Sequence, residues 1–398
     1  MQLFNTMSQG LEDVSIDDTP IGVYVCGVTP YDTTHAGHAF TFLTFDILVR
    51  YLRYLGANVT LVQNVTDIDD DILRRSKELG VAWDELARSE TERYLDDMRS
   101  LNALPFDHFP LASEHIAEIL TMTGRLVDAG NAYASNGSVY FSVASDPSFG
   151  ALSHLPREEM LPIANERGNH PDDPDKRDPL DFVLWQATRP GEPSWDSPFG
   201  PGRPGWHIEC SAMASTYLGL PITVHGGGSD LIFPHHECEI AQAELSTGIA
   251  PFVEVWMHVG MVEYQGEKMS KSLGNLVIAR DVLRTTSSDA FRLYLFSHHY
   301  RTAWEFYDDE LAAFGDVAND LQEAVAIPTI GLGNVVNVDA RSEAFLDALD
   351  DDLNTPAAIE QLQAIAQLIL QAGEEEDVTD AQAILQELGG VLGLTLGS

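Results

Sequence analysis

Residues 21–67 of this 398-residue chain, IGVYVCGVTPYDTTHAGHAFTFLTFDILVRYLRYLGANVTLVQNVTD, contain the pattern that decides the fold. The first eight residues, 21–28, form an apolar, β-rich run typical of a buried parallel strand. A polar loop follows, and residues 40–56 then carry apolar side chains at helical spacing. A second apolar run occupies 58–67. This order predicts a right-handed βαβ unit, the start of a doubly wound parallel sheet in an α/β protein.

The rest of the chain divides by composition. Residues 72–130 have helical patterns, whereas Pro, Gly, Asp and Arg crowd together over about 145–205. Such crowding predicts an irregular insertion that lies over the sheet and has little regular structure. The α/β pattern then resumes, and the signal is helical from about residue 276. We therefore expect an α/β nucleotide-binding domain over 1–275 and a helical C-terminal domain over 276–398.

The charge balance is unusual. Asp and Glu total 62 against 22 Lys and Arg, which gives a formal net charge of -40 and a pI near 4.3. This balance argues against a broad nucleic-acid-binding surface, because phosphate neutralisation needs clustered bases, and we expect no DNA partner. Only four residues are lysine, which fits either a salt-rich cytoplasm or a generally acidic proteome.

The sequence has neither a membrane-spanning pattern nor a secretory signal, and this indicates the cellular compartment. No apolar stretch reaches the 18 residues of a membrane span, and the N-terminus has no secretory pattern, so we expect a cytoplasmic protein without a membrane partner. The three cysteines, Cys26, Cys210 and Cys238, are too few for a disulfide framework. Each is a small buried hydrophobe, a metal ligand or a nucleophile, and we expect Cys238 to be a packing residue.

Two short motifs could carry phosphate chemistry. His35-Ala36-Gly37-His38 lies in the first βα loop, where Gly permits close approach and imidazoles can donate hydrogen bonds to phosphate oxygens, although two histidines in a loop are often incidental. Lys268-Met269-Ser270-Lys271-Ser272 holds two of the four lysines. Two ammonium groups on one loop suit the charge that develops on a departing pyrophosphate.

A metal site can also be assembled from the sequence. Cys26 ends a strand, Cys210 follows Trp206-His207, and His235 and Glu239 share one helical face as an i, i+4 pair. Two thiolates, an imidazole and a carboxylate form a plausible Zn²⁺ ligand set. Buried thiols beside a capping cluster would produce the same pattern.

The two motifs, about 230 residues apart, resemble the HIGH and KMSKS signatures of class I aminoacyl-tRNA synthetases. Other stretches resemble their cysteine-activating branch, the cysteinyl-tRNA synthetases and the related mycothiol-pathway cysteine ligases: YVCGVTPYDTTHAGHA, QNVTDIDDDI, GRPGWHIECSAM, HGGGSDLIFPHHECEIAQAE and KMSKSLGN. The resemblance runs over about 3–390 and implies a Rossmann-like class I catalytic domain with a helical C-terminal domain.

The resemblance also implies a set of site residues. One Zn²⁺ per chain would be bound by Cys26, Cys210, His235 and Glu239. Trp206 would pack near the amino acid and His225 would lie in its pocket; we expect Asp230 to contact the ligand there, or else to make a structural turn. Zn²⁺ would select cysteine over serine, since it binds thiolate strongly and a hydroxyl poorly.

The implied reaction has two steps. The carboxylate of L-cysteine attacks the α-phosphorus of ATP to give cysteinyl adenylate and pyrophosphate, and an acceptor then takes the cysteinyl group. We expect Mg²⁺ with ATP. We expect ATP to be bound by His35, Gly37, His38 and Lys271, and catalysis to depend on His35, His38, Lys268 and Lys271.

The acceptor could be the 3′ end of tRNA(Cys), which we favour, or glucosaminyl-inositol. Glu239 and the EIAQAE text around it resemble the synthetases, because the mycothiol-pathway ligases lack that carboxylate. His38 favours the ligases, because synthetases usually carry Asn at that position, and the net charge of -40 also argues against an RNA partner. We expect the anticodon-binding module to be truncated or absent. A bound tRNA would meet Arg177, Arg189 and Arg203 in the insertion. An inactive nucleotide- or zinc-binding regulatory paralogue is a third hypothesis, which the intact motifs disfavour.

Overall fold

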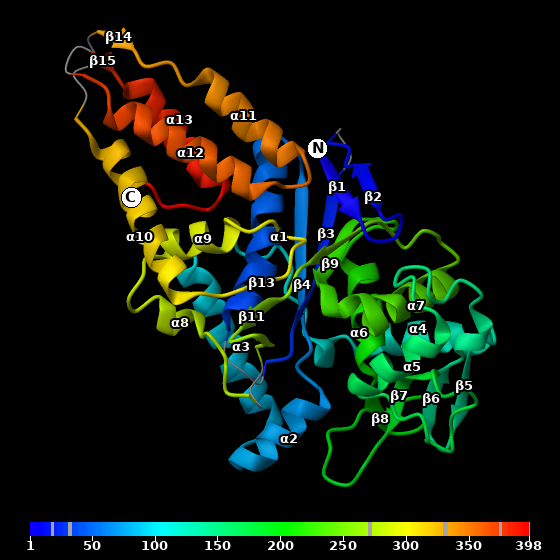
Figure 1. Cartoon of the computed structure of the whole chain (residues 1–398). Coiled ribbons are helices and arrows are strands. Elements are labelled where there is room, and N and C mark those ends of the chain that lie inside the picture. Colours follow the sequence, from blue (N-terminus) through cyan, green and yellow to red (C-terminus); the bar gives the residue numbers. More distant parts are fainter. Residues whose placement is uncertain (17–19, 31–33, 270–272, 329–332, 374–375, 398) are drawn as a thin grey trace.

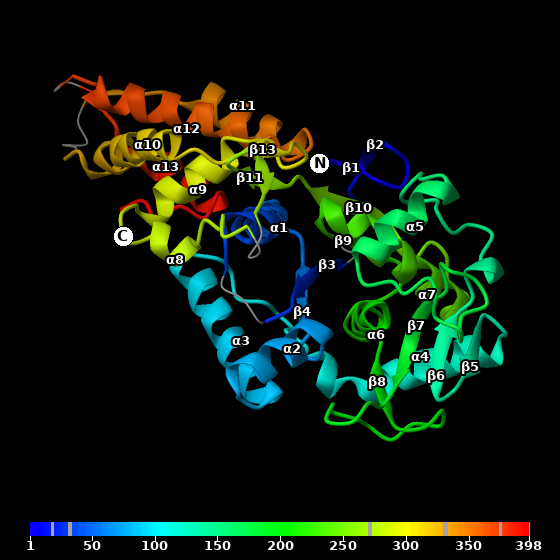
Figure 2. The ribbon, with the colours of Figure 1, turned by 60° about the horizontal axis from the view of Figure 1, so that its bottom comes forward.

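The chain is described here from a computed structural model covering residues 1–398 except 17–19, 31–33, 270–272, 329–332, 374–375 and 398. Its centre is a parallel sheet in the order β10-β9-β3-β4. The strands are β3 (Ile21–Val28), β4 (Val59–Val65), β9 (Ile222–Gly228) and β10 (Val253–Val259). Helices α1 (Ala36–Tyr54) and α6 (Trp206–Tyr217) lie on opposite sides of it (Figure 2). The predicted parallel sheet is confirmed.

Strand β3 is buried on both faces. Val23 and Val25 belong to the core that contains α1, whereas Tyr24 and Cys26 belong to the core that contains α6. Because successive side chains of a strand point to opposite faces, a strand between two helical layers must be apolar throughout. This is why residues 21–28 read as a continuous apolar run, and the structure confirms both their strand and the next one.

Helix α1 begins at Ala36, four residues earlier than the apolar spacing predicts. His35 is its N-cap: the ring Nδ1 accepts hydrogen bonds from the backbone N–H groups of Gly37 at 3.1 Å and His38 at 3.4 Å. Capping by an imidazole has no standard sequence signal, unlike capping by Ser, Thr, Asp or Asn. The first turn of α1 therefore carries the first motif.

The prediction of little regular structure over 145–205 was wrong. This segment contains α5 (Arg157–Glu166) and two strands, β7 (Phe182–Ala187) and β8 (Gly202–Pro204). They extend the hairpin of β5 (Ala132–Ser135) and β6 (Ser138–Phe141) into an antiparallel sheet in the order β5-β6-β7-β8, beside the parallel sheet (Figure 1). Abundant turn residues hid a short apolar strand whose Leu184 and Trp185 are fully buried in a separate core.

The remaining elements are mostly helical, as predicted. Three helices lie between β4 and β5 in the sequence: α2 (Asp70–Leu79), α3 (Trp83–Ser100) and α4 (Ile116–Asp128). Helix α7 (Glu237–Thr247) precedes β10. The C-terminal part contains α8 (Ala279–Val282), α9 (Ser288–Phe296), α10 (Asp308–Ala326), α11 (Asp339–Asp350), α12 (Thr355–Leu370) and α13 (Thr379–Val391). Short strands are β1 (Gln2–Asn5), β2 (Gly10–Asp13), β11 (Val262–Tyr264), β12 (Glu267–Lys268), β13 (Trp304–Glu305), β14 (Asn334–Val335) and β15 (Glu376–Asp377). None of the helices in these described ranges is long and apolar enough to cross a membrane.

A fully buried arginine joins the C-terminal helices to the parallel-sheet domain. Arg292 of α9 forms an ion pair with Asp46 of α1 at 2.5 Å, from Nη2 to Oδ2. Its other nitrogens donate to the carbonyl oxygens of Leu101 and Leu392, each at 2.8 Å. One guanidinium thus connects α1, the end of α3 and the segment after α13.

We expect Arg292→Met to lower the free energy of unfolding by about 3 kcal/mol, because two buried carbonyls lose their donor and Asp46 keeps only Arg50 as a cation. Arg284→Met is the control, since the Arg284–Asp281 pair is largely exposed and should contribute less than about 0.5 kcal/mol. Urea unfolding at one fixed salt concentration measures both. Equal losses in the two variants would contradict the structural role of Arg292.

Candidate active site and metal centre

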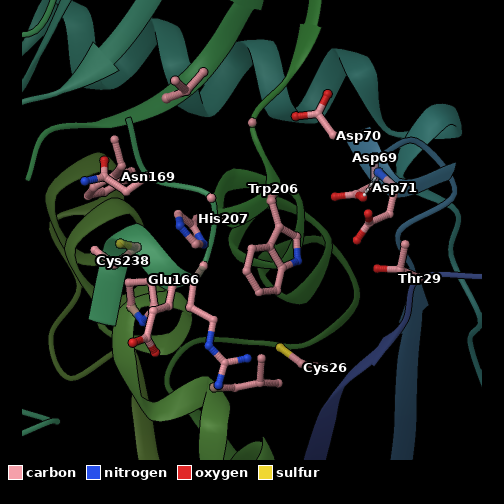
Figure 3. Close-up of a pocket in the computed structure, with 18 of the residues that line it drawn as sticks. Cys26, Thr29, Asp69, Asp70, Asp71, Glu166, Asn169, Trp206, His207 and Cys238 are labelled. Atoms are coloured by element: carbon pink, nitrogen blue, oxygen red, sulfur yellow. Dashed lines mark hydrogen bonds between the residues drawn. The ribbon is translucent and has the colours of Figure 1, made fainter. Parts of the chain in front are cut away.

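A cavity of about 1260 Å³ opens beside the carboxyl end of β3 and the first turns of α1 and α6. Figure 3 shows Asp69, Asp70 and Asp71 gathered on one side of it, across from Glu166 and Asn169, with Trp206 between. Ligands of open parallel sheets bind at the carboxyl ends of the strands. The predicted residues that line this cavity are Cys26, His35, Gly37, His38, Trp206, Asp230 and Lys268.

The first motif presents two imidazole rings to the cavity. Because Nδ1 of His35 accepts two backbone N–H groups, its proton belongs on Nε2, where it can be donated. The His38 ring stacks on His35 with centroids 3.8 Å apart. Burial lowers the pKa of His38 to about 4, although Asp230 acts in the opposite direction. At neutral pH both rings can therefore offer N–H donors without a positive charge on His38.

The described residues on either side of 270–272 lie next to the first motif. Backbone hydrogen bonds from Ala36 to Val277 at 2.8 Å and from Ala279 to Thr34 at 2.9 Å fasten the segment after the lysines to the start of α1. Lys268 Nζ lies 2.9 Å from Asp230 Oδ2. Lys271 lies outside the described residues. The tertiary structure thus places Lys268 and Met269, the described part of the lysine motif, at the same cavity as the first motif.

Asp230 is held between two cations. Its Oδ2 pairs with Lys268 and also with Nη1 of Arg167, at 3.1 Å. Burial alone would raise the pKa of Asp230, but these two cations outweigh it and hold the pKa below its usual value. Arg167 lines the cavity, and sequence reasoning missed it because nothing marks one arginine among the turns of the insertion.

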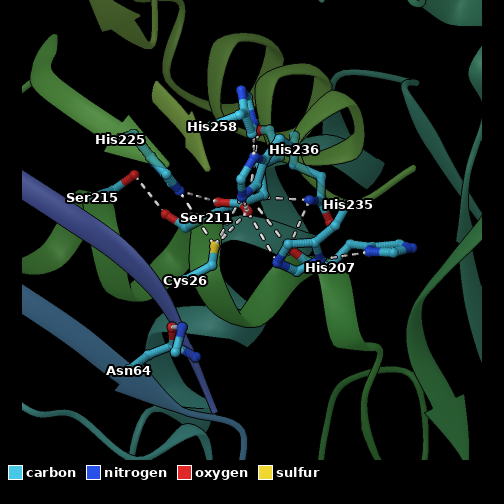
Figure 4. A network of polar contacts seen from close by, with 12 residues as sticks. Cys26, Asn64, His207, Ser211, Ser215, His225, His235, His236 and His258 are labelled. Atoms are coloured by element: carbon cyan, nitrogen blue, oxygen red, sulfur yellow. Dashed lines mark hydrogen bonds and ion pairs between the residues drawn. The ribbon is translucent and has the colours of Figure 1, made fainter. Parts of the chain in front are cut away.

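The predicted ligands converge in a buried cluster. Cys26, Cys210, His235 and Glu239 each offer one ligand atom, and these atoms lie within 4.8 Å of one another. Glu239 Oε1 is 3.2 Å from the Cys26 sulfur and 3.1 Å from His235 Nε2. Figure 4 shows two of them, Cys26 at the end of β3 and His235 just before α7, pointing toward each other. Such a cluster of soft and nitrogen donors can hold a metal ion.

Burial and mutual contact perturb the acids of the cluster. Burial raises the pKa of Cys26 and of Glu239 well above their ordinary values. Burial would also raise the pKa of Cys210, but a hydrogen bond from Cys26 and the nearby His235 lower it to about 7. A divalent cation would relieve the desolvation of these anions, since metal ligands must be deprotonated.

Three further histidines surround the cluster. His225 and His236 complete a second quartet with Cys26 and Glu239, again within 4.8 Å. His236 Nδ1 lies 2.7 Å from His258 Nε2, and His258 Nδ1 lies 2.7 Å from the Thr6 hydroxyl. His225, predicted in the amino-acid pocket, is fully buried with Nε2 3.4 Å from the Cys26 sulfur. Sequence reasoning assigned no role to His236 or His258.

Trp206 stands between the cavity and the cluster. Its ring stacks on His235, with centroids 4.3 Å apart and planes inclined by 19°. Cys238 is buried in the apolar core of the antiparallel sheet and is not part of either quartet. The described residues therefore form one continuous site, in which a cavity lined by His35 and His38 adjoins a buried cluster that could hold a metal ion.

Solved structures with this fold include the methionyl-tRNA synthetase of Mycobacterium tuberculosis in complex with methionyl-adenylate, with a TM-score of 0.66 at 16% identity over 94% of this chain and 88% of that one. The Agrobacterium radiobacter K84 agnB2 LeuRS bound to tRNA and LeuAMS has a TM-score of 0.68 at 12% identity, over 96% and 84%. At such identities the likeness shows the fold, which is that of a class I tRNA synthetase.

Sequence comparison defines the family within this class. A family model for the class I (C) tRNA synthetase catalytic domain matches residues 13–315, and a DALR domain model matches 344–397. A cysteine--tRNA ligase of Dehalococcoides mccartyi is 42% identical over all of this chain and 86% of its own length. An L-cysteine:1D-myo-inositol 2-amino-2-deoxy-alpha-D-glucopyranoside ligase of Parafrankia sp. is 43% identical over 100% and 89%. The chain belongs to the class I (C) tRNA synthetase family, which confirms the resemblance.

We expect His38 to make stability depend on pH. Its folded pKa of about 4 lies below the ordinary 6.5, so the unfolded chain binds a proton that the folded chain excludes. The contribution of neutral His38 to the free energy of unfolding is therefore fully present above pH 6.5 and is lost as the pH falls from there toward 4. His38→Asn should lose about 1 kcal/mol less than the unmodified chain between pH 7.5 and 5.5. Urea unfolding at both pH values tests this, and identical losses would contradict it.

Proposed function

We propose that this protein activates L-cysteine with ATP, giving cysteinyl adenylate and pyrophosphate, and transfers the cysteinyl group to an acceptor. The observation that carries the proposal is the buried cluster of two thiols, an imidazole and a carboxylate that adjoins the cavity of the two signature motifs. Cys26 belongs to the cluster and also lines the cavity. The 42% identity to a protein named cysteine--tRNA ligase supports it.

The cluster is the proposed zinc site. Cys26, Cys210, His235 and Glu239 would hold one Zn²⁺, which when bound provides strong affinity for a thiolate and little for a serine hydroxyl. Trp206 and His225 would border the cysteine side chain, because both rings contact the cluster. A metal–sulfur preference of this kind supplies a discrimination that pocket shape alone cannot provide between isosteres.

The cavity side would hold ATP with Mg²⁺. We assign phosphate contacts to His35, His38 and the glycine between them, Gly37, which lines the cavity. A carboxylate oxygen of cysteine attacks the α-phosphorus, the bond to the β-phosphate oxygen breaks, and pyrophosphate leaves. Lys268 and Lys271 would stabilise the negative charge that accumulates on pyrophosphate. Asp230 pairs with Lys268 and Arg167 and would also contact the substrate.

The 3′ end of tRNA(Cys) is the acceptor we favour. Glu239 completes the predicted ligand set, and the four ligand atoms do lie together. The segment matched by the DALR model, 344–397, contains eleven Asp and Glu and no Lys or Arg. We therefore propose that the segment 344–397 makes few contacts with RNA phosphates, so that recognition depends on the acceptor end.

The insertion offers fewer bases to RNA than the sequence predicts. Arg177 and Arg189 are exposed, although Arg177 also lies over the Tyr133 ring at 3.9 Å. Arg203 is nearly buried, with its guanidinium bound by Asp70 and Glu192. The proposed phosphate contacts of the insertion thus reduce to two side chains, and a shallow salt dependence of RNA binding would follow.

Glucosaminyl-inositol is the second candidate acceptor. Relatives named as ligases of L-cysteine and this aminosugar are as similar as the cysteine--tRNA ligase, at 43% over the whole chain. The carboxylates of Asp69, Asp70 and Asp71 on one side of the cavity suit an amine-bearing acceptor better than an RNA phosphate. For either acceptor we propose a cytoplasmic enzyme.

We expect the purified protein to hold one Zn²⁺ per chain, and Cys210→Ser to release it, because a hydroxyl is a poor zinc ligand. Loss of the metal should weaken cysteine binding at least tenfold more than ATP binding. Metal analysis and calorimetric titration of each substrate check this, with Cys238→Ser as the matched control that keeps its zinc. A zinc-free protein that activates cysteine at full rate would contradict the proposed site.

The acceptor is tested by offering labelled cysteine and ATP with total tRNA, an acceptor-stem minihelix or glucosaminyl-inositol, at low and at molar salt. We expect transfer to tRNA, with the minihelix within about tenfold of full-length tRNA because few phosphates are contacted elsewhere. Transfer to the aminosugar alone would overturn our first choice and leave the activation step intact. ATP–pyrophosphate exchange that fails to depend on cysteine would instead indicate the inactive paralogue.

A further inference from the structure

The first turn of α6 carries three side chains that face the metal cluster. Trp206 and Cys210 are separated by one helical turn, and His207 lies between them. His207 lines the cavity and belongs to neither ligand quartet. Its ring Nδ1 lies 2.9 Å from the ring Nδ1 of His235 (Figure 4). His207 therefore contacts a proposed metal ligand, His235, but is not itself a proposed ligand.

The contact between the two rings determines where their protons lie. In a hydrogen bond between two Nδ1 atoms, one carries the proton and the other offers its lone pair. His235 Nε2 faces the cluster, 3.1 Å from Glu239 Oε1, and a nitrogen that binds a metal must have its lone pair free. The proton of His235 therefore belongs on Nδ1, which donates to His207, and His207 carries its own proton on Nε2.

The surrounding contacts hold His207 in place to accept this bond. The His207 carbonyl accepts a hydrogen bond from Gln242 Nε2 of α7 at 2.9 Å, which joins α6 to the helix that carries Glu239. The Phe182 ring meets the His207 ring edge-on at 5.7 Å. Trp206 stacks on one face of the His235 ring. The contact with His207 holds an edge of the same ring, so the two contacts together restrict rotation of His235 about its side-chain bonds.

We propose that His207 is a positioning residue for the metal centre, which fixes the ring orientation and the tautomer of His235 by accepting its Nδ1 proton. Helix α6 would then supply one ligand, Cys210, and orient a second ligand that comes from another element. The inference rests on the proposed zinc site. A hydrogen-bond partner behind a ligating histidine commonly affects metal affinity 10- to 100-fold when it is removed.

The test compares metal binding by four full-length chains. His207→Phe keeps an aromatic ring but has no acceptor, and His207→Asn places an amide oxygen near the position of Nδ1. Phe182→Leu changes the packing on His207 without removing a hydrogen bond, and the unmodified chain is the reference. Zn²⁺ affinity is measured by competition with a chelator, and the Co²⁺-substituted forms report ligand geometry through their d–d absorption. Circular dichroism of the metal-free chains checks that each variant is folded.

We expect His207→Phe to bind Zn²⁺ 10- to 100-fold more weakly and to alter the Co²⁺ spectrum, and His207→Asn and Phe182→Leu to stay within about threefold of the reference. Unchanged affinity and spectrum in His207→Phe would overturn the inference while leaving the zinc site intact. Equal weakening in His207→Phe and His207→Asn would also overturn it, since ring packing and not the hydrogen bond would then be responsible. A reference chain whose Co²⁺ form shows no thiolate-to-cobalt band would overturn the zinc site and this inference together.

Discussion

Strand β3 is the constraint on which the rest of the site depends. It is buried between α1 and α6, and its alternating side chains enter both cores. The same strand therefore places Cys26 in the cluster of possible metal ligands on the α6 side and leads toward the start of α1. Gly27 allows this placement, because a Cβ there would meet the Asn64 carbonyl oxygen at 1.7 Å. Any shift of β3 would displace the cluster and the start of α1 together.

The cavity carries basic and acidic side chains on different sides. Two of the bases that line the cavity, Lys268 and Arg167, share Asp230, so that these two cations and one carboxylate form a group of net positive charge. Carboxylates occupy another side of the same cavity, at Asp69, Asp70 and Asp71. A polyanion and an amine would consequently be drawn to different parts of one cavity. In a chain of net charge -40, this trio is a local group of net positive charge.

Burial also governs the protonation of the acids in the cluster. Cys26 and Glu239 are almost or fully inaccessible, and burial raises the pKa of each, which favours the neutral forms in the absence of a counter-charge. Cys210 departs from this trend because Cys26 and His235 act on it directly. A divalent cation that bound here would have to displace the protons of these thiols and of the carboxylate, because metal ligands must be deprotonated.

The sequence by itself determined the elements whose periodicity is continuous: the strand at 21–28, the next strand, predicted over 58–67 and observed at Val59–Val65, and the helical character of the C-terminal part. It also showed the two motifs, which are short and contiguous. With the family resemblance it also indicated Cys26, Cys210, His235 and Glu239, which lie together as expected. Only the tertiary structure decided the antiparallel sheet of the insertion, since β7 and β8 are short and surrounded by turn residues. It alone also decided the contacts of Arg167 with Asp230 and of His207 with His235, at separations of 63 and 28 residues. Local patterns report which face of an element is buried, but the pairing of polar side chains from different elements depends on how those faces are packed against one another.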